Sequence, residues 1–77
     1  MNEAEILSEI AQVLEVSTQS LKLSDDLQSR NWDSLALVSF MAVMDEKYHV
    51  VLPARELGKV RSVADLLGLV KQSLGKK

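Results

Sequence analysis

Cysteine is absent from the 77 residues, so neither a disulfide nor a thiolate metal site can help to hold the fold. The composition is compatible with a reducing compartment, and we expect a cytoplasmic protein. Long apolar runs are also missing, since the longest, Phe40–Met44, is far shorter than the roughly 20 residues that span a bilayer. Asn2, Glu3 and Glu5 stand where a signal peptide would have a basic start. We therefore expect no membrane insertion.

Groups that catalysis needs are scarce. The chain has one histidine, His49, and it has no glycine-rich phosphate loop, histidine pair or cysteine cluster. A nucleophilic serine needs a base within hydrogen-bond reach, and His49 would lie about four helical turns from Ser34. We expect His49 to be an ordinary surface or loop residue, and we do not expect an enzyme.

Charge is distributed unevenly along the chain. Residues 1–52 carry nine acidic and three basic side chains, whereas residues 53–77 carry two acidic and six basic ones. A duplex-binding domain usually shows a basic face, so the acidic front half argues against nucleic acid as a partner. The lysines of the basic end suit the C-terminus of a helix, where cations are favoured. They are Lys71, Lys76 and Lys77.

Capping signals mark the first helix and the loop that follows it. Asn2 and Glu5 have the spacing of a capping box, and an apolar stripe at helical spacing predicts a helix from there to near Val16. Residues 17–31 are polar and predict a long loop, which in so small a domain is usually functional or well packed. Three leucines are expected to anchor this loop in the core. They are Leu21, Leu23 and Leu27.

The second half of the chain predicts two more main helices and a short one. Asp33 has the side chain of an N-cap and predicts a helix over residues 34–48. Pro53 predicts the start of a short turn of helix through Leu57.

A capping-box-like pair, Ser62 and Asp65, precedes the last apolar stripe, which Gly75 closes. The expected fold class is all-α: a small bundle of three main helices plus one short helix, with a long loop between helices 1 and 2. A chain of this length makes one domain, residues 1–77, and we expect a monomer.

Two apolar lines run along the helix expected over residues 34–48. The core face is predicted from five side chains within roughly a 100° arc. They are Leu37, Phe40, Met41, Met44 and Tyr48. The second line is Leu35, Val38 and Ala42, flanked by Ser39 and Glu46. Three main helices cannot bury both lines, so we expect the second to stay partly exposed and to dock partners. The alternative is that the first helix or the long loop covers it.

The triplet Asp33-Ser34-Leu35, at the start of a helix that follows a long loop, resembles the attachment motif of acyl carrier proteins. The resemblance covers nearly the whole chain, up to "SVADLLGLV" at 62–70, and includes its length, helix order and acidic front half. It implies that Ser34 is esterified by 4′-phosphopantetheine, whose terminal thiol carries acyl groups as thioesters. Asp33 and Leu35 would be the motif residues read by the phosphopantetheinyl transferase. Further partners implied by the resemblance are acyl-loading and acyl-transferring enzymes such as ketosynthases or acyltransferases.

Elementary electrostatics agrees with a phosphate at this serine. The first turn of a helix offers unpaired backbone N–H groups and the positive end of the dipole. Ser34 would need no base of its own, because a separate enzyme would perform the phosphoryl transfer.

Several residues depart from the carriers of primary fatty-acid synthesis. Those carriers usually place acidic side chains soon after the serine, where this chain has Ala36 and Ser39, and Lys47 lies near the helix end. They often have glycine before the aspartate, where Trp32 stands here; we expect Trp32 to be a packing plug and not a substrate contact. The departures favour a specialised fatty-acid, polyketide or related lipid pathway.

Two alternatives stay open at this point. One is an aminoacyl or peptidyl carrier of a nonribosomal or D-alanyl type route, which shares the serine and the arm. The other is a helical protein-interaction adaptor without a prosthetic group, in which residues 33–35 only cap a helix.

Overall fold

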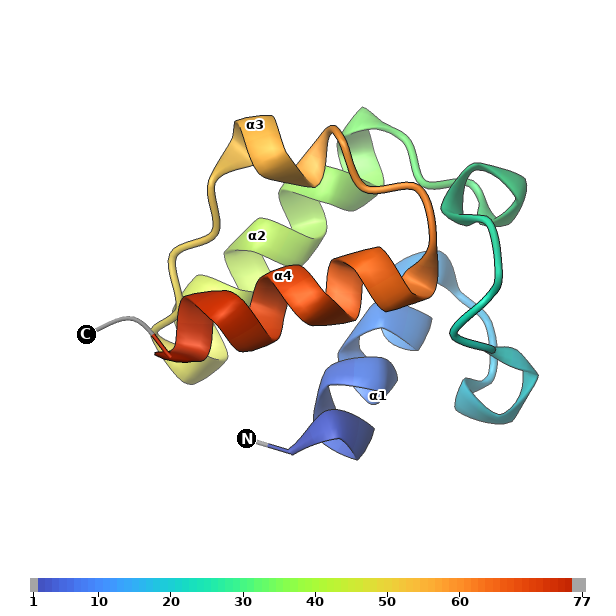
Figure 1. Ribbon diagram of the computed structural model, residues 1–77, viewed down its shortest axis with the longest axis horizontal. Coiled ribbons are helices and arrows are strands. Elements are labelled where there is room, and N and C mark those ends of the chain that lie inside the picture. Colours follow the sequence, from blue (N-terminus) through green and yellow to red (C-terminus); the bar gives the residue numbers. More distant parts are fainter. Residues whose placement is uncertain (1, 76–77) are drawn as a thin grey trace.

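The computed structural model describes residues 2–75, whose regular secondary structure is helical, without a β-strand (Figure 1). The long helices are α1 (Glu3–Leu14), α2 (Ser34–Tyr48) and α4 (Val63–Gly75), and α3 (Ala54–Leu57) is short. The expected all-α bundle of three main helices plus one short helix is therefore confirmed. The loop between α1 and α2 contains two 3₁₀ turns that were not predicted, η1 (Thr18–Ser20) and η2 (Leu27–Arg30). Lys76 and Lys77 lie outside the described residues.

The helices begin where the capping signals predict. The capping box of α1 is complete: Glu5 N–H donates to Asn2 Oδ1 at 2.8 Å, and Asn2 N–H donates to Glu5 Oε1 at 2.9 Å. Ahead of α4, Asp65 N–H donates to Ser62 Oγ at 3.1 Å. The end of α1 was predicted too late, because Glu15 adopts a left-handed conformation (φ 59°) and ends the helix at Leu14.

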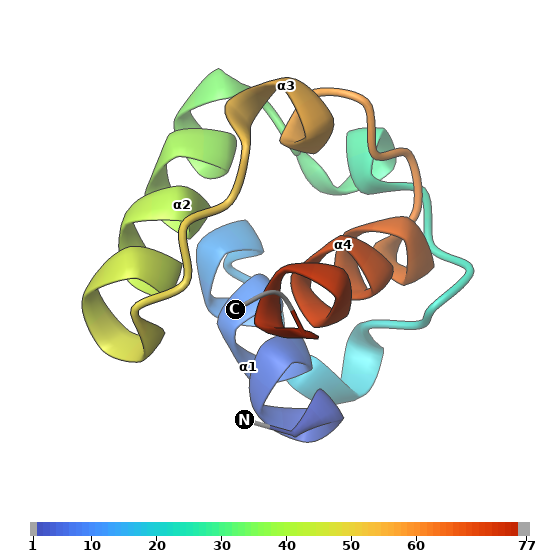
Figure 2. The ribbon, with the colours of Figure 1, turned by 60° about the vertical axis from the view of Figure 1, so that its left-hand side comes forward.

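The three long helices surround one core. In Figure 2, α1 lies below α4, α2 runs along their side, and α3 lies across the top between α2 and α4. The largest fully buried side chains come from all four helices and from the connecting segments. They are Phe40, Ile6, Ile10, Leu27, Met44, Leu52, Leu57, Leu66, Val63 and Val70.

The buried face of α2 is rotated from the predicted one. Ala36, Phe40 and Met44 are buried at spacings of four residues. The other predicted core residues, Leu37, Met41 and Tyr48, are half-buried at the edge of the core. The centre of the buried arc therefore lies about 60° from the expected centre. The reason is that α1 packs on the Ala36 side of α2, and an alanine gives little hydrophobic signal in a sequence.

The loop between α1 and α2 is held by backbone hydrogen bonds to the start of α4. They run from Leu27 N to Arg61 O (2.8 Å), from Val63 N to Asp25 O (3.0 Å) and from Ala64 N to Leu23 O (2.9 Å). Two of the predicted anchors, Leu21 and Leu27, are buried. The third prediction was wrong: the side chain of Leu23 is exposed, because this residue lies in the turn that is closed by the hydrogen bond from Asp25 N–H to Lys22 O at 3.0 Å.

A buried carboxylate joins α1 to the end of α2. Glu9 is only 5% exposed, and its Oε2 accepts hydrogen bonds from Tyr48 Oη at 2.9 Å and from Lys47 Nζ at 3.4 Å. The hydrogen bond to Glu9 raises the pKa of Tyr48, and desolvation acts in the same direction. A buried charge is tolerated when it is paired in this way.

Tyr48→Phe removes the shorter of the two bonds to Glu9. A buried acceptor that loses a partner is left with uncompensated desolvation, so we expect the Tm to fall by on the order of 4–8 °C at neutral pH. The change in Tm is measured by thermal unfolding, monitored by circular dichroism. Lys47→Met is the matched control, because that side chain is half exposed and its ion pair should contribute less. An unchanged Tm for Tyr48→Phe would mean that water replaces the hydroxyl.

Candidate functional site

Ser34 is the first residue of α2 and is exposed to solvent. The preceding Asp33 is the N-cap: its Oδ1 accepts from Ala36 N–H at 2.9 Å, and its carbonyl accepts from Leu37 N–H at 2.9 Å. The N–H groups of the two residues between, Ser34 and Leu35, belong to the first turn, which has no partners within a helix. A 15-residue helix therefore presents its positive end beside an accessible hydroxyl.

A tight turn brings the chain to that position. Asn31 ends η2 in a left-handed conformation (φ 64°), and its carbonyl accepts from Asp33 N–H at 3.0 Å. The Trp32 side chain between them packs on Phe40, with ring centroids 6.0 Å apart and an interplanar angle of 69°. Its indole N–H donates to Leu57 O at 3.4 Å. Trp32 thus joins the turn to α2 and α3, in agreement with the predicted packing role.

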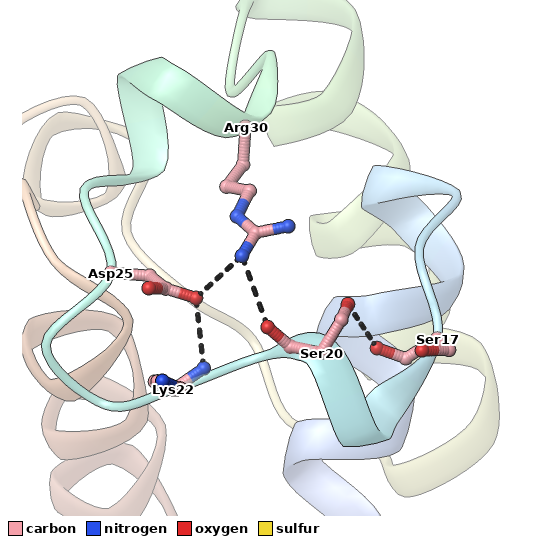
Figure 3. A network of polar contacts seen from close by, with 5 residues as sticks. All are labelled: Ser17, Ser20, Lys22, Asp25 and Arg30. Atoms are coloured by element: carbon pink, nitrogen blue, oxygen red, sulfur yellow. Dashed lines mark hydrogen bonds and ion pairs between the residues drawn. The ribbon is translucent and has the colours of Figure 1, made fainter.

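A polar network that the sequence analysis did not single out braces the loop before this turn (Figure 3). Arg30 Nη2 donates to Asp25 Oδ2 at 2.9 Å and to Ser20 O at 3.0 Å. The same Asp25 oxygen accepts from Lys22 N–H at 2.9 Å. These contacts lower the pKa of Asp25. The hydrogen bond from the Lys22 N–H has the largest effect, and among the other lowering contacts the positive charge of Arg30 comes next. In the sequence, the only sign of this network is a pair of opposite charges, Asp25 and Arg30, five residues apart in a polar loop.

The second apolar line of α2 is exposed as predicted, and we call it the α2 apolar line. Leu35 is 76% and Val38 is 58% exposed, and Ala42 is exposed as well. Neither α1 nor the long loop covers these side chains. Of the flanking residues, Glu46 is exposed and Ser39 is half-buried.

Ala36 and Lys47, which distinguish the chain from acidic carriers, both contact other parts of the fold. Ala36 was not among the predicted core residues, but it is only 7% exposed, because the end of α1 lies close to it. An acid could not occupy this position as a surface charge. Lys47 is engaged by Glu9.

His49 is exposed and ends α2 in a left-handed conformation (φ 57°). It is about 20 Å along the helix axis from Ser34, so no Ser–His pair forms. Residues 2–75 contain no group of three or more histidine and acidic side chains placed to hold a metal ion. Over the same residues, no helix has the length and apolar character that crossing a bilayer requires.

The chain matches the family model of the phosphopantetheine attachment site over residues 4–70. Domains of this family bear a covalent 4′-phosphopantetheine group and act as carriers that are handled by modifying and synthetic enzymes. No curated protein matches the chain. The matched residues include Ser34 and the whole of α2, and the exposed hydroxyl at a helix start fits the attachment of a phosphate ester.

Asp25→Asn tests the network of Figure 3 through its pH dependence. A carboxyl whose pKa is lowered by folding stabilises the protein fully above its ordinary pKa, and it loses that effect as pH falls through the folded value. We expect the variant to melt below the wild type at pH 7 and the difference to close below about pH 4. Asp45→Asn, an exposed change on α2 outside the network, is the control for the loss of one negative charge. A difference that stays constant from neutral to acidic pH would contradict the assignment.

Proposed function

Since the chain belongs to the phosphopantetheine-attachment family, we propose that it is an acyl carrier protein whose 4′-phosphopantetheine arm is esterified to Ser34. The observation that carries the assignment is the position of this hydroxyl: it is exposed, at the first residue of a long helix, between Asp33 and Leu35. Ser62 is a capping residue, and Ser39 is half-buried within α2.

The division of labour follows from that position. A phosphopantetheinyl transferase installs the arm, with Asp33 and Leu35 as the motif residues beside the serine. The arm's thiol then carries the cargo as a thioester, and the carrier needs no catalytic group of its own. A tether keeps the cargo at an effective concentration of roughly millimolar once the carrier has docked, so weak and reversible docking is sufficient.

We propose the α2 apolar line as the docking surface for the enzymes that load and unload the arm. Leu35 and Val38 are among the large hydrophobic side chains that stay exposed, and both lie within four residues of Ser34. Ala42 continues the line, and Ser39 and Glu46 flank it. Partners such as ketosynthases or acyltransferases would need an apolar patch that matches it.

The proposed pathway is a specialised fatty-acid, polyketide or related lipid route. We propose that the carrier acts as a monomer in the cytoplasm. The support is the scarcity of acidic charge on the exposed surface after Ser34, since Ser39 is neutral and Val38 is apolar. An aminoacyl or peptidyl carrier remains the second candidate, because it would use the same serine and arm. The thioester found by mass spectrometry on the protein purified from its own source distinguishes the two. The adaptor without a prosthetic group loses its support, since the family is defined by that group.

Ser34→Ala tests the attachment directly. Removing this exposed hydroxyl should change the free energy of unfolding by less than about 0.5 kcal/mol. We expect the wild type to gain the mass of one phosphopantetheine when it is treated with coenzyme A and a broad-specificity transferase, and the variant to gain none. Ser29→Ala, an exposed serine of η2, is the control and should be modified like the wild type. Modification of the Ser34→Ala protein would assign the arm to another residue.

Val38→Asp tests the docking surface. A charge there is solvated in the free protein but becomes an unpaired buried charge in a complex. We expect the holo variant to keep its Tm within about 2 °C and to lose most acyl transfer to its partner enzyme. Leu23→Asp is the matched control, because it makes the same apolar-to-acid change at an exposed leucine outside α2. Equal loss of transfer in both variants would argue against a docking role for the α2 apolar line.

A further inference from the structure

A pocket lies between the end of α1 and the first half of α2, on one flank of the α2 apolar line. Its volume is about 430 Å³. One wall comes from α2, and the opposite wall comes from the end of α1 and the residues that follow it. The lining side chains used below are Val13, Glu15, Val16, Asp33, Leu35 and Ser39. We call it the α1–α2 pocket.

The pocket faces a docked enzyme and not the arm. Ser34 does not line it, and the Ser34 side chain leaves α2 about 140° around the helix from Ser39, which is part of the wall. Leu35 lies between these two directions and is 76% exposed. This leucine therefore belongs both to the α2 apolar line and to the rim of the pocket. An enzyme that docks on the α2 apolar line extends over that rim.

The lining combines two carboxylates with apolar carbon. Glu15 and Asp33 each carry a negative charge, and no described side chain of the lining is basic. The Oδ1 atom of Asp33 caps α2, so its Oδ2 atom is the one that can accept a further donor. Val13 and Val16 are half-buried and add apolar surface to the α1 wall.

A long cationic side chain matches this lining. The guanidinium group of arginine is always charged, is weakly hydrated for a cation, and presents its N–H donors in a planar fork that suits carboxylates. Its methylene stem can lie on the valines while the charged end reaches the carboxylates. An apolar side chain would instead cover both carboxylates without a partner, which is costly. A phosphate would be repelled by them.

The other flank of α2 differs in charge. The hollow between α2 and α3 has a volume of about 420 Å³, and its lining is apolar apart from Asp45. A cation therefore finds two carboxylates on the α1 side of α2 and one on the α3 side. This difference gives an enzyme with a suitably placed arginine a preferred orientation on the helix.

We propose that the α1–α2 pocket receives an arginine side chain of an enzyme that docks on the α2 apolar line. The inference rests on the proposed carrier function, because that function brings enzymes to α2. The acidic charge that is scarce on the exposed surface after Ser34 is supplied from the flank of the helix, by Glu15 and Asp33. An enzyme without a cation at this place would cover both carboxylates uncompensated and would be disfavoured.

The test tethers an arginine beside the pocket, because a single free arginine binds weakly. The chain has no cysteine, so Ala42→Cys places one thiol on the α2 apolar line, at an exposed residue about one turn from Ser39. The apo protein is equilibrated in a glutathione buffer with equal amounts of two peptides, Cys-Gly-Arg amide and the uncharged Cys-Gly-citrulline amide. Intact mass measures the ratio of the two disulfide adducts.

We expect the arginine adduct to exceed the citrulline adduct by roughly two- to fivefold at low salt, as for a partly exposed pair of charges. Raising the salt concentration should reduce this preference. In the nuclear magnetic resonance spectrum, the arginine adduct should shift the backbone amides of Asn31 and Ser39 more than the citrulline adduct does. Equal amounts of the two adducts at low salt would overturn the proposal.

Glu15→Gln, made in the Ala42→Cys protein, should bring the ratio close to one, because it removes the charge and keeps the size of the side chain. Glu46→Gln is the matched control. It makes the same change at an exposed glutamate of α2, one turn from the tether, and should keep the preference. A preference that is lost with Glu46→Gln and kept with Glu15→Gln would place the arginine on the surface of α2 and overturn the pocket assignment.

The outcomes for the pocket and for the carrier function are distinguishable, since the peptides bind without the arm. Treatment of the wild type with coenzyme A and a broad-specificity transferase tests the function separately. A wild type that gains the arm, with no arginine preference in the tethered protein, overturns the pocket assignment alone. A wild type that gains no arm overturns the carrier function, and the assignment of the arginine to a docking enzyme falls with it.

Discussion

Backbone hydrogen bonds between residues 23–27 and residues 61–64 determine where α2 can begin. The shortest of them, 2.8 Å from Leu27 N to Arg61 O, fixes a fully buried leucine at the start of η2. From there the chain has a single 3₁₀ turn and a left-handed residue before it reaches Asp33. Because this path is short and hydrogen-bonded, the end of the loop has little conformational freedom. The exposed serine that follows is held by the fold as a whole and not by its own contacts.

The same constraint decides which side of α2 faces the core. With its start held and with α1 packed on the Ala36 side, the helix buries residues at spacings of four and leaves Leu35 and Val38 in solvent. An isolated exposed leucine needs no explanation, but an apolar line that begins beside the proposed attachment residue does. Polar residues there would cost nothing in packing and would improve solubility. Their absence is consistent with a surface retained for contact.

The sequence predicted the parts of this fold that depend on neighbouring residues. The capping pairs located the starts of α1 and α4, and Asp33 located the start of α2, because each cap is a contact over three residues. What it missed depends on residues far apart in the chain. The pairing of Leu23 and Asp25 with the start of α4 and the burial of Ala36 beside α1 both join residues that are far apart in the chain. The exposed line was predicted because hydropathy reports it, and the exposed Ser34 because a short motif and an N-cap report it, whereas the ion pair of Arg30 with Asp25 exists only once the loop is folded.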